Sequence, residues 1–262
     1  MGDLMRSELR KISSTRLWWG LLLGAVLFTA LQSGVNAAVA GIDTGGGQPP
    51  SPALDSPEAI RTVYAGSAFA GTYIFAMILG ITGMTGEYRY QTITPTFLVT
   101  PRRTRVVLAK MLAHLVVGFG YGLVGLVTAL VVGGVVIVIR DFGLGYDTEQ
   151  LWSGAFLVAV GVALWTLLGI GIGTLIRNQV AAIMVAVFIT FLVEPIATFA
   201  LNAVDLDNVV KWLPTNASAA LTSPGDTFID YLDWWVGGLV LIAYAAILAG
   251  LGLRLSVRRD VT

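Results

Sequence analysis

The stretch that decides the fold is MTGEYRYQTITPTFLVTPRRTRVVLAKM, residues 84–111. It lies between two long apolar segments and holds five of the sixteen basic residues of the chain. No other stretch mixes charged, aromatic, threonine and proline residues so densely. We interpret it as a cytosolic loop that docks on another protein. The alternative is a solvated basic loop that only satisfies the positive-inside rule.

Two threonine–proline pairs, at residues 94–95 and 100–101, give this loop the pattern of helix starts. Each pair places a capping hydroxyl before a proline at the first helical position. The first pair predicts a short helix over residues 95–99 that exposes Phe97 and Leu98. The second predicts a helix that begins at its proline and runs into the membrane.

The composition is that of an integral membrane protein. The chain is 56% hydrophobic and only 12% charged, against about 25% charged for a soluble domain, and its mean hydropathy is +0.79. With no cysteine and one histidine, the sequence excludes a disulfide framework and cysteine-based or histidine-rich metal sites. It has no glycine-rich phosphate loop of the G-x-x-x-x-G-K-[ST] kind. We therefore expect no catalytic residue, no metal, no bound cofactor and no nucleic-acid partner.

Long apolar runs predict an all-α membrane protein in one transmembrane domain, residues 1–262, with membrane lipids around it. The six predicted spans cover residues 17–40, 62–84, 106–139, 151–176, 180–203 and 234–255.

Two polar segments are predicted to form short helices outside the spans. In residues 3–17, apolar side chains recur at near-helical spacing, which predicts an amphipathic helix in the cytosolic interface. A simple basic flank of the first span is the alternative. Residues 204–233 are polar and acidic, and we expect one or two short helices there, resting on the outer membrane surface as an extracytoplasmic connector.

The basic residues also predict the topology. Thirteen Lys and Arg lie in the N-terminus, the second and fourth loops and the C-terminus, and three lie on the other side. The positive-inside rule then places both termini in the cytosol.

Two isolated residues inside predicted spans each have two interpretations. Glu194, next to Pro195, is the only acid well inside a span, where an acid costs about 2.5–3.5 kcal/mol on insertion scales. It is either a substrate or gating contact at a proline-broken helix, or a polar residue satisfied by backbone groups that Pro195 frees. His114 either titrates near neutral pH or is a hydrogen-bonded packing residue.

Three small-x-x-x-small patterns are weaker signals, and we interpret them as helix-packing positions within one subunit. They are Gly20 with Gly24, Gly118 with Gly122, and Gly169 with Gly173.

The docking loop carries a family resemblance. Glu87, Thr92, the segment LVTPRR at residues 98–103 and then Lys110 occur in that order. This order resembles the cytosolic loop of type-2 ABC transporter permeases, in which Arg103 or Arg105 would fill the arginine position of the family. Pro95 is an addition to the pattern.

The resemblance implies the membrane subunit of an ATP-driven exporter in the bacterial cytoplasmic membrane. A separate ATPase, in two copies, would bind ATP and Mg. A second permease copy or a homologous permease would complete a substrate path lined by spans 1, 2 and 5. The 85–105 loop would form the coupling helix, with Phe97 and Leu98 in a cleft of the ATPase and charged residues at its rim. The implied coupling residues are Glu87, Arg89, Thr92, Phe97, Leu98, Pro101, Arg102, Arg103 and Arg105.

Two other functions remain open at this point. A non-transporting membrane partner of an ATPase, such as an immunity or signalling module, would have the same spans and docking loop. An ion-coupled secondary transporter is disfavoured, because only one acid lies well inside a span and no inverted repeat is visible.

Overall fold

The computed structural model describes residues 2–42, 52–92, 103–147, 149–222 and 232–259. Within these ranges every regular element is a helix, and six helices are long and apolar enough to cross a membrane. The prediction of an all-α membrane protein with six spans is confirmed.

Several spans are built from consecutive helical segments. In chain order the spans are α2 (Leu17–Val39), the run α3 (Pro57–Arg61), η1 (Thr62–Gly66) and α4 (Ser67–Arg89), α6 (Arg103–Ile139), α7 (Glu149–Leu175), the run α8 (Gln179–Phe188), η2 (Ile189–Val193) and α9 (Glu194–Asn202), and α12 (Trp234–Arg259). In the part of the chain that the structure describes, three short helices lie outside the spans: α1 (Gly2–Ser14), α10 (Asp207–Val210) and α11 (Pro214–Thr222).

The second span is longer at both ends than its apolar run predicts. It begins at Pro57, where the Ser56 hydroxyl accepts a hydrogen bond from the Ala59 N–H at 3.2 Å and caps the helix. It continues to Arg89, so residues 85–89 of the predicted loop are helical. The predicted coupling helix over residues 95–99 lies outside the described residues.

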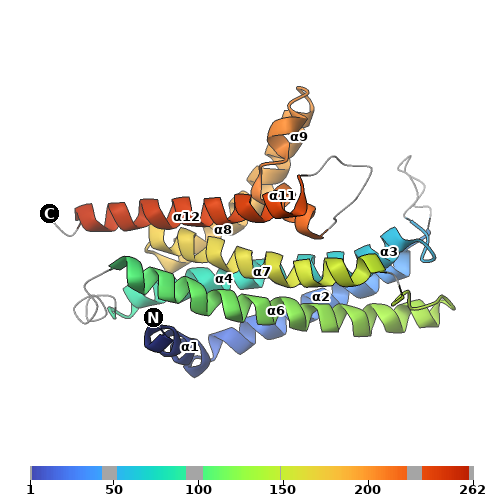
Figure 1. Ribbon diagram of the computed structural model, residues 1–262, viewed down its shortest axis with the longest axis horizontal. Coiled ribbons are helices and arrows are strands. Elements are labelled where there is room, and N and C mark those ends of the chain that lie inside the picture. Colours follow the sequence, from blue (N-terminus) through green and yellow to red (C-terminus); the bar gives the residue numbers. More distant parts are fainter. Residues whose placement is uncertain (1, 43–51, 93–102, 148, 223–231, 260–262) are drawn as a thin grey trace.

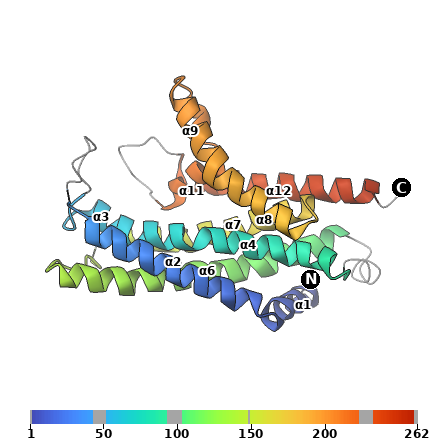
Figure 2. The same ribbon diagram turned by 180° about the vertical axis from the view of Figure 1, so that it is seen from behind.

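Helices α4 and α7 form the centre of the bundle (Figures 1 and 2). α7 packs against α4, α6 and α12, while α2 packs against α4 and α6. In the most apolar stretch of the second span and of α7, 72% of the residues are buried, against 22% in α2 and in the α8–α9 span. The bundle therefore has two central spans and two that present most of their apolar surface outward.

Glycines let the central helices approach closely. A Cβ added at Gly169 of α7 would lie 2.1 Å from the Met77 carbonyl oxygen of α4, and one at Gly122 of α6 would lie 2.5 Å from the Ala159 Cα of α7. The packing role predicted for these glycines and for their partners Gly118 and Gly173 is confirmed. It is wrong for Gly20, where nothing lies within 4 Å of an added Cβ.

The fifth span is bent outward but remains helical. Its wide turn η2 comes directly before Glu194 and Pro195. A wide turn accommodates a proline because it loosens the hydrogen-bond ladder that the proline interrupts. The expectation that the Glu194–Pro195 pair breaks this helix is therefore wrong. In both views, α9 leans away from the other spans (Figures 1 and 2).

The connector between the fifth and sixth spans contains the short helices that were predicted, α10 and α11. α11 packs against α12 and α7, and its predicted position at the outer membrane surface stays a prediction. Leu221 of α11 belongs to the main apolar core, and Trp165 of α7 donates a hydrogen bond to the Ser218 hydroxyl at 2.7 Å. α11 is thus a part of the bundle.

Helix α1 and the end of α12 lie at the same end of the bundle (Figures 1 and 2). This agrees with an even number of spans.

Candidate functional site

The docking loop has two stems, the end of α4 and the start of α6. The first stem is fixed by the way α4 ends. Gln91 adopts a left-handed conformation with φ 56°, and its N–H donates to the Tyr88 carbonyl at 3.3 Å. The next N–H, of Thr92, donates to the Glu87 carbonyl at 2.9 Å. These two bonds form a Schellman motif, which satisfies the last carbonyls of the helix. The chain therefore leaves α4 in a defined direction, one turn after Glu87.

The second stem is the start of α6, which carries two buried polar side chains. Lys110 is 2% exposed and His114 is 1% exposed. They lie four residues apart and therefore on the same face of the helix. The His114 Nδ1 lies 2.9 Å from the Lys110 carbonyl oxygen.

Helix α1 contributes an acid from the middle of its apolar stripe. Glu8 is spaced four residues from both Leu4 and Ile12, so all three share one face. Glu8 is buried while Leu4 and Ile12 are partly buried, and α1 packs against α6. The stripe thus faces the base of the bundle, with a carboxylate at its centre.

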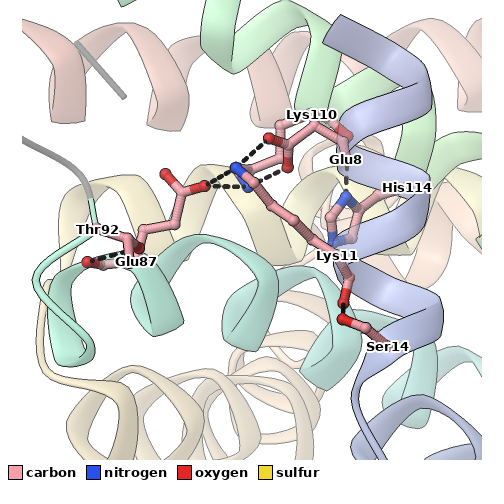
Figure 3. A network of polar contacts seen from close by, with 7 residues as sticks. All are labelled: Glu8, Lys11, Ser14, Glu87, Thr92, Lys110 and His114. Atoms are coloured by element: carbon pink, nitrogen blue, oxygen red, sulfur yellow. Dashed lines mark hydrogen bonds and ion pairs between the residues drawn. The ribbon is translucent and has the colours of Figure 1, made fainter. Parts of the chain in front are cut away.

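These three elements meet in a closed ring of four ion pairs, shown in Figure 3. The Lys110 Nζ lies 2.5 Å from Glu8 Oε2 and 3.0 Å from Glu87 Oε1. The Lys11 Nζ lies 2.6 Å from Glu8 Oε1 and 2.7 Å from Glu87 Oε1. Each lysine contacts both carboxylates, so the four formal charges cancel. Pairing of this kind is what makes burial of these charges tolerable.

The two α1 members of the ring are charged over a wide pH range. Burial alone would raise the pKa of the Glu8 carboxyl, but Lys110 and Lys11 outweigh it and lower that pKa below its ordinary value. Burial alone would lower the pKa of the Lys11 ammonium, but the hydrogen bonds to Glu8 and Glu87 outweigh it and raise that pKa. Each partner therefore stabilises the charged form of the other.

His114 completes the site as a hydrogen-bonded residue. A carbonyl oxygen can only accept, so Nδ1 donates to the Lys110 carbonyl. The packing interpretation of His114 is confirmed. Among the described residues, neither His114 Nε2 nor Glu87 Oε2 has a hydrogen-bond partner. Gly83 of α4 makes room for the imidazole, because an added Cβ would lie 2.1 Å from Nε2.

A cavity of about 590 Å³ opens beside the ring. Glu87, Lys110 and His114 line it on the buried side, and the exposed residues Arg16 and Tyr90 line it near the surface. The cavity therefore runs from the ion pairs to the outside of the bundle.

The structure describes the side chains of four predicted coupling residues, Glu87, Arg89, Thr92 and Arg105. Glu87 is buried and ion-paired within the chain, so its placement at an exposed rim is wrong, while its part in coupling stays a prediction. Arg89 donates to the Gln179 side chain at 3.4 Å, which ties the end of α4 to the start of α8, and Thr92 caps α4. Arg105 is exposed on α6.

The remaining predicted coupling residues are not described in side-chain detail. Arg103 is the first residue of α6, and only its backbone is described. Four others lie outside the described residues: Phe97, Leu98, Pro101 and Arg102. Their roles stay predictions.

Glu194, the predicted substrate-path residue, is buried and is the first residue of α9 in the fifth span. Its Oε2 accepts a hydrogen bond from the Thr215 N–H at 2.8 Å, in the first turn of α11. A second bond joins the same helices, from the Asn216 amide to the Thr198 hydroxyl at 3.1 Å. The partner of Glu194 is thus the start of α11 and not the backbone around Pro195. Its role in a substrate path stays a prediction.

Sequence reasoning missed the partners of Glu87 on α1. The amphipathic pattern of residues 3–17 gave Glu8 no separate role, although Glu8 lies on the apolar stripe. That position was the available signal, because an acid centred on an apolar stripe needs a cation when the stripe is buried. Among the described residues no group of histidine, aspartate and glutamate could hold a metal ion.

Comparison with known proteins identifies the family. A family model described as ABC-2 family transporter protein matches residues 4–193, from α1 to the end of η2. A search of curated proteins gave no match. The family match covers well over half of the chain and all of the residues that form the ion-pair ring. The chain therefore belongs to the ABC-2 transporter family and is a multi-pass membrane permease of the ABC transporter type.

Proposed function

We propose that this permease is the membrane subunit of an ATP-driven exporter, coupled through the loop after α4 to a separate ATPase. Two ATPase copies would bind ATP and Mg, and two permease copies, or one copy with a homologous permease, would enclose the substrate path. The family match supports the permease role. Export, the copy numbers and the coupling are the steps that we add.

The observation that carries this proposal is the ion-pair ring around both stems of the loop. Glu87 stands on the last turn of α4, and Lys110 stands near the start of α6. Both are bound to α1 through Glu8 and Lys11. A displacement of the loop by a partner would therefore move three helices together. Such a rigid-body shift between two packings is how transporters and switches commonly change state.

The outward-facing span supports a path between two permease subunits. Aromatic residues follow one another on the surface of α8, η2 and α9, where Phe188, Phe191 and Phe199 are 55%, 54% and 78% exposed. Contiguous exposed apolar surface marks a protein–protein or membrane contact. The buried carboxylate of Glu194 lies on this same span, which suits a polar contact on the substrate path.

The test is co-purification of the natural ATPase with the Phe97→Ala, Leu98→Ala double variant, together with ATPase activity linked to transport. Buried aromatic anchors carry much of the energy of an interface, and we expect truncation of Phe97 to cost about 2 kcal/mol of binding. The variant should still insert and dimerise. A matched control is Phe142→Ala, Leu144→Ala in the loop after α6, which should leave the ATPase bound.

Wild-type co-purification and wild-type ATPase activity of the Phe97, Leu98 variant would contradict the coupling proposal. An ATPase that binds the permease but moves no substrate from a broad compound panel would instead support a non-transporting partner.

The cytosolic position of the loop is tested separately. The chain has no cysteine, so single cysteines report cleanly. Cysteines at Ser51 and Thr227 should react with an impermeant label from outside the cell, and one at Thr104 should not. Labelling at Thr104 from outside would overturn the topology.

A further inference from the structure

The last turn of α4 has a second contact face beside the one that carries Glu87. Successive residues of an α-helix are rotated by about 100° around its axis, so Tyr88 and Arg89 do not share the face of Glu87. Tyr88 is half-buried and Arg89 is exposed. Both contact the segment in which the fourth span ends and the fifth begins. The first stem of the docking loop therefore contacts this segment as well as the ion-pair ring.

Two side-chain contacts join the stem to the start of the fifth span. The central guanidinium carbon of Arg177 lies 5.2 Å from the centroid of the Tyr88 ring, within the range of about 6 Å for a cation–π attraction. The Arg89 guanidinium donates to the Gln179 Oε1 at 3.4 Å, and Gln179 is the first residue of α8. α4 also packs directly against α8.

The start of α8 is built so that a displacement at this point acts on the whole helix. Only residues 176–178 separate α7 from α8. Asn178 is the N-cap of α8, and its side-chain oxygen accepts a hydrogen bond from the Ala181 N–H at 3.0 Å. Such a cap ties the connection to the first turn of the helix. A displacement of Arg177 or Gln179 is therefore passed to α8.

The fifth span is also easier to move than the central spans. In its most apolar stretch 22% of the residues are buried, against 72% in the second span and in α7. An element with few buried apolar contacts costs less free energy to displace. The ion-pair ring joins α1, α4 and α6, and none of its four members lies on the fifth span. The contacts of Tyr88 and Arg89 supply the connection that the ring does not make.

We propose that Arg177 and Gln179 are positioning residues that pass a movement of the docking loop to the fifth span. This rests on the proposed coupling of the loop to an ATPase, and it adds the route by which the movement reaches that span. When the last turn of α4 shifts, Tyr88 and Arg89 displace the start of α8. The ring displaces α1 and α6 through its own ion pairs, so each of the two connections can be broken without the other.

The test places one reporter on each connection, in the full-length permease bound to its natural ATPase. Because the chain has no cysteine, single cysteines at Ser7 of α1 and at Val180 of α8 can carry an environment-sensitive fluorophore. Both side chains are exposed. The probe is ATP with vanadate, which traps the ATPase within its cycle, so no transported substrate is needed. With an otherwise unchanged sequence, we expect the fluorescence of both reporters to change.

Tyr88→Leu and Arg177→Gln each remove the cation–π contact. Each should reduce the Val180 response by about twofold to fivefold, because a contact can bias a state by no more than its own interaction free energy. The Ser7 response should persist. The double variant should fall no further than either single variant, as expected for two partners in one contact. Tyr88→Phe keeps the ring face and should retain the Val180 response.

Tyr90→Leu is the matched control. Tyr90 is 71% exposed, and its ring centroid lies 5.7 Å from the guanidinium carbon of Arg89, so this cation–π contact stays within the end of α4. The change should leave both reporters as they are.

An undiminished Val180 response in both Tyr88→Leu and Arg177→Gln would overturn the proposal. Loss of both responses together would also overturn it, because the two connections would then not be separate. An otherwise unchanged complex in which neither reporter responds would instead contradict the ATPase coupling on which the proposal rests.

Discussion

Two buried carboxylate sites of this permease are satisfied in different ways. At the base of the bundle, Glu8 and Glu87 are held by two lysines in a ring that joins α1, α4 and α6. On the fifth span, Glu194 accepts a hydrogen bond from the backbone N–H of Thr215 in α11. The carboxylates of the first site are paired with lysine ammonium groups, and that of the second accepts from a neutral donor.

The difference separates a structural link from an adaptable contact. Removing one member of a buried ion pair leaves an uncompensated charge, which is strongly destabilising. A carboxylate that accepts one N–H bond at a helix start can be replaced by any acceptor of similar shape. We therefore infer that the ring holds α1 and both stems of the docking loop as one unit, while Glu194 tolerates change and is free to serve function.

The largest effect should come from Lys110→Met. This change keeps the length of the side chain and removes the buried ammonium, so Glu8 and Glu87 share only Lys11. We expect the free energy of unfolding to fall by about 3–5 kcal/mol, measured by denaturant unfolding of the full-length chain in mixed micelles. A loss below about 1 kcal/mol would mean that water enters the ring and that the two sites differ little.

Glu194 should give a smaller effect that depends on the substituent. Glu194→Leu leaves the Thr215 N–H without its acceptor and should cost about 1–3 kcal/mol. Glu194→Gln keeps an acceptor oxygen and should assemble and express nearly as wild type, yet alter transport if the side chain lines the path. Transport assays beside unfolding curves separate the two outcomes. If Glu194→Leu is silent in both, the residue is only an interfacial group.

Lys11→Met is the matched substitution at the exposed edge of the ring. The Lys11 side chain is 43% exposed, so solvent screens its ion pairs, and exposed pairs contribute about 0–1 kcal/mol. The same unfolding measurement should place this variant within that range. A cost equal to that of Lys110→Met would show that the ring acts as a unit regardless of exposure.

A change of pH is expected to have the smallest effect on the free energy of unfolding. The lowered pKa of Glu8 contributes stability that is present above its unfolded pKa of about 4.3 and is lost as the pH falls through the folded value. The raised pKa of Lys11 contributes stability that is present below about pH 10.4 and is lost as the pH rises through the folded value. The contribution of these two groups to the free energy of unfolding should therefore stay constant between about pH 5 and pH 9.

The spans could be predicted from the sequence because each is encoded locally, by an apolar run and its flanks. The site could be predicted only in part. Glu87 was recognised from its place in the loop pattern, but its partner Lys110 lies 23 residues away and Glu8 lies 102 residues from Lys110. Helical periodicity reports which residues share a face and does not report what that face meets. The burial of α11 was missed for the same reason, since its small residues read as polar connector.

The central claim is that the ring binds α1 to the stems of the docking loop, and a double-mutant cycle tests it most directly. The cycle measures the free energy of unfolding of the full-length chain with Glu8→Gln, with Lys110→Met and with both changes. Residues in one ion-pair network show interaction energies of about 0.5–3 kcal/mol, and for this pair we expect about 2 kcal/mol. Effects that add to within about 0.5 kcal/mol would contradict the claim, because α1 would then not be linked to α6 through this pair.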